Sequence, residues 1–188
     1  MIFVALLRAI NVSGQNRVPM AELRELLGGL GLRDVQTYLQ SGNVVFEAAG
    51  EATAADLATA IEARIERDMG LCVGVLVLSA GALAEVAGAV PFAGEPGVDE
   101  KWLHATFLFG AAGATGFDAL ALPADEGEAA AFVGAPPLAS PVIYLKLPHG
   151  YGRTKLTNVW FERKLGVAAT TRNWRTVRAL VEMSAGED

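Results

Sequence analysis

The sequence predicts an α+β fold of two ferredoxin-like (βαββαβ-type) subdomains in tandem, the second incomplete and carrying an extra C-terminal helix. Short apolar runs typical of strands alternate with stretches of helical spacing, and the element order of the first half returns in outline in the second. A Gly- and Pro-rich segment, 91–97, separates the two halves. We therefore expect subdomains at residues 1–90, which includes a connecting helix, and 98–188.

The first half is predicted as strand, helix, strand, strand, helix, strand. Proline suits the first turn of a helix, so the first helix begins near Pro19 and ends at the Gly28–Gly29 pair. A turn at 40–43 between two apolar runs predicts a hairpin. The expected strands are 2–7, 35–39, 44–46 and 72–78, and the later helices are 53–69 and 79–89.

The second half is predicted as strand, helix, strand, strand, helix, helix. The expected strands are 102–109, 129–133 and 142–147, with a short helix at 117–122 and a loop at 135–141. The last two helices are expected at 154–165, ended by Gly166, and at 173–183. No residue-level repeat links the halves, so internal duplication is a hypothesis.

Composition excludes several classes. With 188 residues, 52% hydrophobic and 19% charged, the chain is not disordered. The single Cys72 excludes an internal disulfide and a cysteine-based zinc site, and only two histidines are present, so we expect no metal and a cytoplasmic location. The best candidate for a membrane span, the uncharged run between Asp68 and Glu85, has 16 residues, and the N-terminus lacks a basic signal-peptide region, so no membrane association is expected.

The net charge of −6 is unevenly distributed. Residues 1–139 hold 7 basic and 17 acidic side chains, a net of −10, whereas residues 140–188 hold 8 basic and 4 acidic, a net of +4. The acidic average argues against general nucleic-acid coating. The basic C-terminal end is compatible with a local anion site, or with an ordinary solvated helix face.

Two polar segments in the first half are candidates for ligand binding. The loop 8–19 precedes a helix, whose N-terminus favours anions, and it contains Arg8, Asn11 and Arg17. The hairpin turn contains Gln40, Ser41 and Asn43; turn chemistry explains most of it, but Gln40 could orient a ligand. The alternative for both segments is local satisfaction of their own backbone.

Two further segments lie near the C-terminus. Residues 149–158 alternate glycine with His149, Tyr151 and Arg153 and continue through Lys155 into a predicted helix, with Thr154 as a possible cap. Residues 170–175 place Trp174 beside Arg172 and Asn173, where the indole could stack on a planar ligand or lie in the core.

No catalytic constellation is visible, and GxGxxG and Walker A patterns are absent, so no cofactor is expected. His149 is a weak candidate for acid or base work. Ser13 or Ser41 as a nucleophile with His104 or His149 as base has no local support.

The stretch LLRAINVSGQNRVPMAELRELLGGLGLRDVQTYLQSGNVVF resembles the start of a bacterial family, domain-of-unknown-function family 1697. The tail YGRTKLTNVWFERKLGVAATTRNWRTVRAL is similar to the family's closing motif, and we expect the resemblance to span the whole chain. It implies an α+β fold with two ferredoxin-related subdomains and no established activity, cofactor or substrate. Ala9 and Ser13 depart from the family's more Gly-rich loop.

Three functions remain open. The first is binding of an anionic ligand (a phosphate-bearing metabolite, a nucleotide or, less favoured, a short single-stranded nucleic acid) in a cleft between the subdomains. There Arg8, Arg153, Lys155 and Arg172 would neutralise charge, Asn11 and Asn173 would form hydrogen bonds, and Trp174 or Tyr151 would stack. The second is an enzyme acting on a small anionic substrate. The third is a purely structural role for these motifs. The oligomeric state is left open.

Overall fold

The N-terminal part of the chain folds around a four-stranded antiparallel sheet with strand order β2-β3-β1-β4. The strands are β1 (Ile2–Leu7), β2 (Arg33–Tyr38), β3 (Asn43–Glu47) and β4 (Val75–Ser79). All four lie where the sequence predicts strands, although β4 begins three residues later than expected. In the register, Phe3 pairs with Phe46 and Ala5 with Val44, which places apolar side chains from neighbouring strands on one face.

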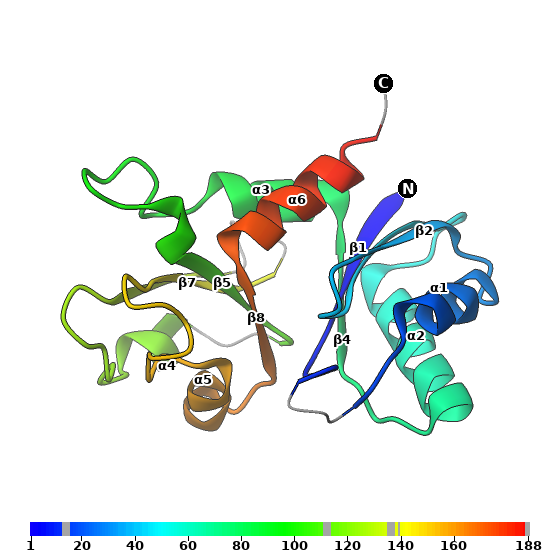
Figure 1. Cartoon of the computed structure of the whole chain (residues 1–188), viewed down its shortest axis with the longest axis horizontal. Coiled ribbons are helices and arrows are strands. Elements are labelled where there is room, and N and C mark those ends of the chain that lie inside the picture. Colours follow the sequence, from blue (N-terminus) through cyan, green and yellow to red (C-terminus); the bar gives the residue numbers. More distant parts are fainter. Residues whose placement is uncertain (13–15, 111–113, 135–137, 139, 187–188) are drawn as a thin grey trace. The chain divides into compact units, whose positions relative to one another are not determined.

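That face is covered by α1 (Met20–Gly28) and α2 (Ala54–Met69), which lie on the same side of the sheet (Figure 1). Leu23 and Leu27 of α1 and Ile61 and Ile65 of α2 recur at helical spacing, and all four are buried in one core with the strands. The helix α2 begins with a capping box, in which Thr53 accepts from the backbone N–H of Asp56 and the Asp56 carboxylate accepts in return.

The C-terminal part forms a second four-stranded antiparallel sheet, with order β6-β7-β5-β8. Its strands are β5 (Leu103–Leu108), β6 (Ala129–Val133), β7 (Val142–Lys146) and β8 (Ala169–Asn173), preceded by the 3-10 turn η1 (Glu100–Trp102). The helices are α4 (Ala114–Asp118) and α5 (Asn158–Leu165). The core on one face holds buried side chains of strands and helices, among them Ile143, Leu145 and Phe161.

The prediction of an incomplete second half was wrong, because the sequence reading missed β8. Its sequence, ATTRN, lacks the apolar run of the other strands, yet it pairs with β5, and Thr171 Oγ1 lies 2.9 Å from Thr106 Oγ1 on that strand. Threonine favours strands through its β-branched side chain. Pairing with β5 therefore makes this segment a strand, although its sequence lacks an apolar pattern.

Two helix starts also differ from the prediction. The helix α5 begins at Asn158 rather than 154, because Thr157 acts as its cap and accepts from the Trp160 N–H at 3.2 Å. Thr154 is buried and outside the helix. The short helix α4 covers 114–118 rather than 117–122.

A helix follows the fourth strand of each half and starts in the same way. Ser79, the last residue of β4, accepts from the Ala82 N–H at 3.1 Å at the start of α3 (Ala80–Gly88). Asn173, the last residue of β8, accepts from the Thr176 N–H at 2.8 Å at the start of α6 (Trp174–Ser184). Both halves thus share the order strand, helix, strand, strand, helix, strand, helix; duplication remains a hypothesis.

The structure is a computed structural model that describes residues 1–12, 16–110, 114–134, 138 and 140–186. Backbone contacts divide the chain into an N-terminal unit, Met1–Leu83 with Leu180–Asp188, and a C-terminal unit, Ala84–Ala179. The division falls within α3 and α6 rather than in the 91–97 segment. The ranges 1–90 and 98–188 as domains stay a prediction.

Candidate functional site

An open groove of about 480 Å³ lies in the N-terminal unit where the first loop meets the start of α1, and we call it the N-terminal groove. It brings together three of the predicted site residues: Asn11 and Arg17 from the first loop and Gln40 from the hairpin turn. Its lining residues are Asn11, Arg17, Val18, Pro19, Met20, Ala21, Arg24 and Gln40. Two of these are arginines and none is acidic. The first backbone N–H groups of α1 have no carbonyl partner within the helix, which adds positive potential nearby.

The two arginines differ in how they are held. Arg24 Nη1 donates to Thr37 Oγ1 at 2.7 Å, a neutral partner, and the side chain has no ion pair among the described residues. The exposed Arg17 side chain has neither a hydrogen bond nor an ion pair among the described residues. The sequence analysis overlooked Arg24. Its spacing of three and four residues from Ala21 and Met20 places it on the groove face of α1, and this helical spacing was the available signal.

Asn11 holds the first loop against the hairpin turn. Its Nδ2 donates to Val18 O at 2.9 Å and to Gln40 O at 2.7 Å, and its Oδ1 accepts from the Val18 N–H at 2.9 Å. Asn11 and its loop neighbours Ala9 and Asn16 have φ values of 47° to 53°, in the left-handed region that costs most residues energy. Asn11 is therefore a structural residue of the groove, and both of its amide hydrogens are already donated.

The hairpin turn is held in a similar way. Asn43 is fully buried, and its Nδ2 donates to Tyr38 O at 3.0 Å and to Ser41 Oγ at 2.9 Å. Gly42 has φ +72°, and its carbonyl accepts from the Leu7 N–H at 2.8 Å. Asn43 and Ser41 thus fix the turn itself, which favours the structural alternative for both. Ser13, the other serine considered as a nucleophile, lies outside the described residues.

Arg8 stands apart from the groove lining. It is half-buried at the end of β1, and its backbone N–H donates to Gly74 O at 2.8 Å. The structure therefore anchors the backbone at Arg8 in the N-terminal unit, and a ligand-binding role for its side chain stays a prediction.

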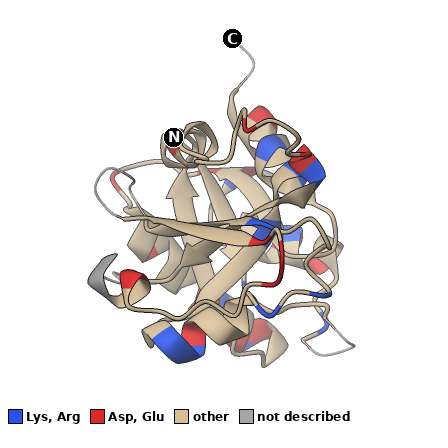
Figure 2. Ribbon diagram, turned by 90° about the vertical axis from the view of Figure 1, so that its left-hand side faces the viewer, with Lys and Arg blue, Asp and Glu red and all other residues tan. Residues whose placement is uncertain are grey.

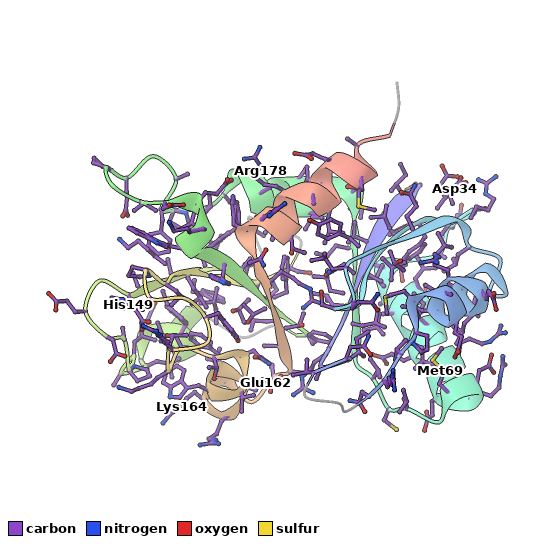
Figure 3. The ribbon with its side chains drawn as sticks, in the orientation of Figure 1. Asp34, Met69, His149, Glu162, Lys164 and Arg178 are labelled. Atoms are coloured by element: carbon purple, nitrogen blue, oxygen red, sulfur yellow. The ribbon has the colours of Figure 1, made fainter. Side chains whose placement is uncertain are left out.

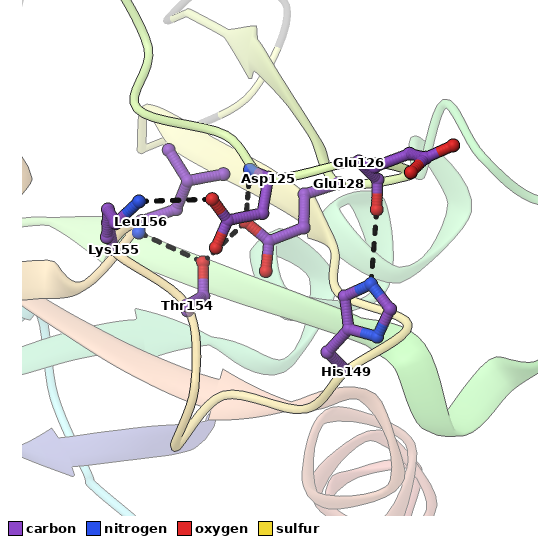
Figure 4. Close-up of polar contacts among 7 residues, drawn as sticks. All are labelled: Asp125, Glu126, Glu128, His149, Thr154, Lys155 and Leu156. Carbon is purple, nitrogen blue, oxygen red and sulfur yellow. Dashed lines mark hydrogen bonds and ion pairs between the residues drawn. The ribbon is translucent and has the colours of Figure 1, made fainter.

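Residues of the 125–128 turn contact three side chains of the first C-terminal segment. Lys155 forms an ion pair with Asp125 at 3.1 Å, and Thr154 Oγ1 donates to Glu128 at 2.9 Å (Figure 4). His149, on the loop after β7 (Figure 3), donates from Nε2 to the Glu126 carbonyl at 3.2 Å. Within the predicted anion segment, Asp125 thus compensates the charge of Lys155, a contact that the sequence analysis did not predict.

The helices of the C-terminal end carry acidic as well as basic residues, such as Glu162 beside Arg163 and Lys164 on α5. Blue and red positions lie next to one another on several helices of the ribbon (Figure 2). Arg153 is exposed and has no side-chain hydrogen bond or ion pair within the described ranges. It does not precede a helix directly, because α5 starts five residues later.

Tyr151 is held in a polar network of the C-terminal unit. Its hydroxyl donates to Asn158 Oδ1 at 2.8 Å and accepts from the Asn158 N–H at 2.9 Å, and Thr171 Oγ1 lies 3.2 Å away. Its ring stacks on His104, with 5.4 Å between the centroids. Burial lowers the pKa of His104, whose Nδ1 donates to Trp102 O. Tyr151 therefore stacks on a protein side chain, and one ring face is occupied.

The last three candidates are built into the second sheet and its following helix. Trp174 is 5% exposed and packs against Tyr144, so the proposed stacking platform is wrong: no open indole face is available. Arg172 is buried, its Nη1 donates to Thr170 Oγ1 at 2.7 Å, and burial lowers its pKa to about 10. Asn173 caps α6 through its side-chain oxygen.

Two further properties concern the described ranges as a whole. Within them, no three His, Cys, Asp or Glu side chains are placed to hold a metal ion together. None of the helices in this part of the chain combines the length and apolar character that crossing a bilayer requires. Convergence of the N-terminal and C-terminal candidates on one ligand stays a prediction.

Comparisons with known proteins agree on the fold. A search of curated proteins finds no match. A solved structure, that of a conserved bacterial protein from Streptococcus pneumoniae, is similar with a TM-score of 0.68 and 23% identity, over 97% of this chain and 98% of that one. The family model described as "Protein of unknown function (DUF1697)" matches residues 1–136, which include the first quoted motif but not the tail. Since this match covers most of the sequence, the chain belongs to the DUF1697 family.

Proposed function

We propose that the N-terminal groove binds a small phosphate-bearing anion. The observation that carries this proposal is the pairing of Arg17 and Arg24 in a groove with no acidic lining residue. Arginine presents planar N–H donors that match phosphate oxygens, and a volume of about 480 Å³ lies within the range of small-molecule sites. Arg17 can bind an anion without breaking a side-chain contact to any described residue.

Titration calorimetry at low ionic strength tests this proposal, with inorganic phosphate, pyrophosphate and nucleoside monophosphates as probes. Arg17→Ala and Arg24→Ala are each expected to weaken binding by about tenfold or more, because each removes a charge-assisted hydrogen bond. Arg67→Ala is the matched control: it removes the same charge from the same unit, at an exposed position of α2 that pairs with Asp68 outside the groove. No binding of any probe, or an equal loss in the Arg67 variant, would show that the groove is not an anion site.

We further propose that each half of the chain, in the ranges 1–90 and 98–188, is a ferredoxin-like βαββαβ domain. The shared strand order and the two helices on one face of the first sheet support this proposal. Limited proteolysis is expected to cut first within 91–97, and first cuts inside either range would contradict the boundaries. We also place the protein in the cytoplasm, on the ground of its single cysteine, which cell fractionation tests.

A further inference from the structure

Gln40 lies in the lining of the N-terminal groove with an uncommitted side chain. Its backbone carbonyl accepts from Asn11, but its exposed side-chain amide has no hydrogen-bond partner in the described part of the chain. A glutamine amide offers two donor hydrogens next to one acceptor oxygen. Among the groove-lining residues, Gln40 has the one side-chain amide whose donor hydrogens have no described partner, since Asn11 donates both of its own.

The backbone that carries Gln40 is held from both sides. Asn11 bonds to its carbonyl, Asn43 bonds to Tyr38 O two residues before it, and Gly42 O, two residues after it, accepts from the Leu7 N–H. A side chain on a fixed backbone loses less entropy when a ligand orders it. Asn11 and Asn43 thus fix the backbone around Gln40, which lowers the entropic cost of a directional contact from its side chain.

Two exposed apolar residues are sequence neighbours of residues in the groove lining. Leu39 precedes Gln40 and is 57% exposed, with φ +57°, and Val12 follows Asn11 and is 58% exposed. A left-handed φ is strained for a leucine, and such strain gathers at functional sites. The groove lining thus combines two arginines with a directional amide, and two exposed apolar residues adjoin that lining in the sequence.

Resting on the proposed function, we propose that Gln40 determines specificity and that the ligand is an adenine nucleoside monophosphate. Arg17 and Arg24 hold the phosphate, and the Gln40 amide pairs with the adenine edge, donating to N7 and accepting from the N6 amino group. Guanine presents two acceptors, N7 and O6, at that edge, so the Gln40 oxygen would face an acceptor. The amide therefore favours adenine over guanine.

Calorimetric titration with AMP, GMP and inorganic phosphate tests this assignment on the full chain, the Gln40→Leu variant and the Gln36→Leu variant. Gln36 is an exposed glutamine of β2 that does not line the groove, so it is the matched control. We expect the unaltered chain and the Gln36 variant to bind AMP about tenfold more tightly than GMP. We expect Gln40→Leu to lose this preference while GMP and phosphate binding stay within about twofold.

The outcomes separate the two proposals. Equal binding of AMP and GMP by the unaltered chain, with phosphate binding intact, overturns the role of Gln40 but leaves the anion site standing. A preference that persists in Gln40→Leu also overturns it. No binding of any of the three probes overturns the anion site and the assignment of Gln40 with it.

Discussion

The substitution Gly42→Ala tests how the hairpin turn and the first loop are held together. A Cβ atom at position 42 would lie 2.6 Å from Leu7 Cβ and 2.8 Å from Ile10 Cδ1, closer than carbon atoms can approach. The backbone there has φ +72°, which costs an alanine about 1–2 kcal/mol. Overpacking of a buried site adds about 1–3 kcal/mol, so we expect a loss of about 2–5 kcal/mol in the free energy of unfolding.

Urea denaturation followed by far-ultraviolet circular dichroism measures this loss against Gly31→Ala. Gly31 has a similar φ, +82°, but nothing lies within 4 Å of its Cβ position, so its variant reports the backbone cost without the steric one. The difference between the two variants is the steric contribution, which we expect to be about 1–3 kcal/mol. If Gly42→Ala is no less stable than Gly31→Ala, the packing of Leu7 and Ile10 against the turn is wrong.

Three other substitutions test separate contacts. Thr53→Ala removes the cap of α2 and should cost about 1 kcal/mol at neutral pH. The Thr53 hydroxyl lowers the pKa of Asp56, so part of this contribution needs the ionised carboxylate. The loss of stability in Thr53→Ala, measured as the shift in urea midpoint, should therefore become smaller as the pH falls below about 4. Burial lowers the pKa of His104, so the unfolded chain takes up that proton first; stability should fall below about pH 6.5, and less so in His104→Gln. An NMR midpoint for His104 above that pH would contradict this. Tyr144→Phe removes the hydrogen bond to Val86 O at 2.8 Å and should cost about 1–2 kcal/mol. Burial also raises the pKa of Tyr144, so an ultraviolet titration in which all three tyrosines ionise in the folded state would refute its burial.

Local sequence patterns predicted the N-terminal unit well because its elements carry their own signals. Apolar runs, the Thr53 cap and the glycines that follow α1 and α2 act over a few residues, and the structure places elements there. In the second half the same reasoning missed β8, whose polar residues become a strand through pairing with β5. It also placed the start of α5 too early, because Thr154 is a possible cap by residue type, whereas in the structure Thr157 caps the helix and Thr154 donates to Glu128.

The candidate site residues also divide into those that local sequence signals predicted correctly and those whose role depends on long-range contacts. Residue type and spacing predicted Arg17 and Gln40, which line the groove with free side chains, but the same reasoning included Asn43 and Trp174, which are buried. It could not show that the 125–128 turn compensates Lys155, because those residues lie about thirty positions away in the chain. Charge arithmetic likewise pointed to the C-terminal end, whereas the arginine-lined groove lies in the unit with the more acidic sequence.

By itself, the sequence determined the family, the α+β class and seven of the eight strands found in the described ranges, since these depend on local periodicity and motif. The tertiary structure decided which polar side chains are used internally and which remain available to a ligand. A hydrogen bond such as that from Asn11 to Gln40 joins residues 29 positions apart, and no local pattern encodes it. Long-range pairing therefore separates Asn11, whose amide holds the loop, from Gln40, whose side-chain amide has no partner among the described residues.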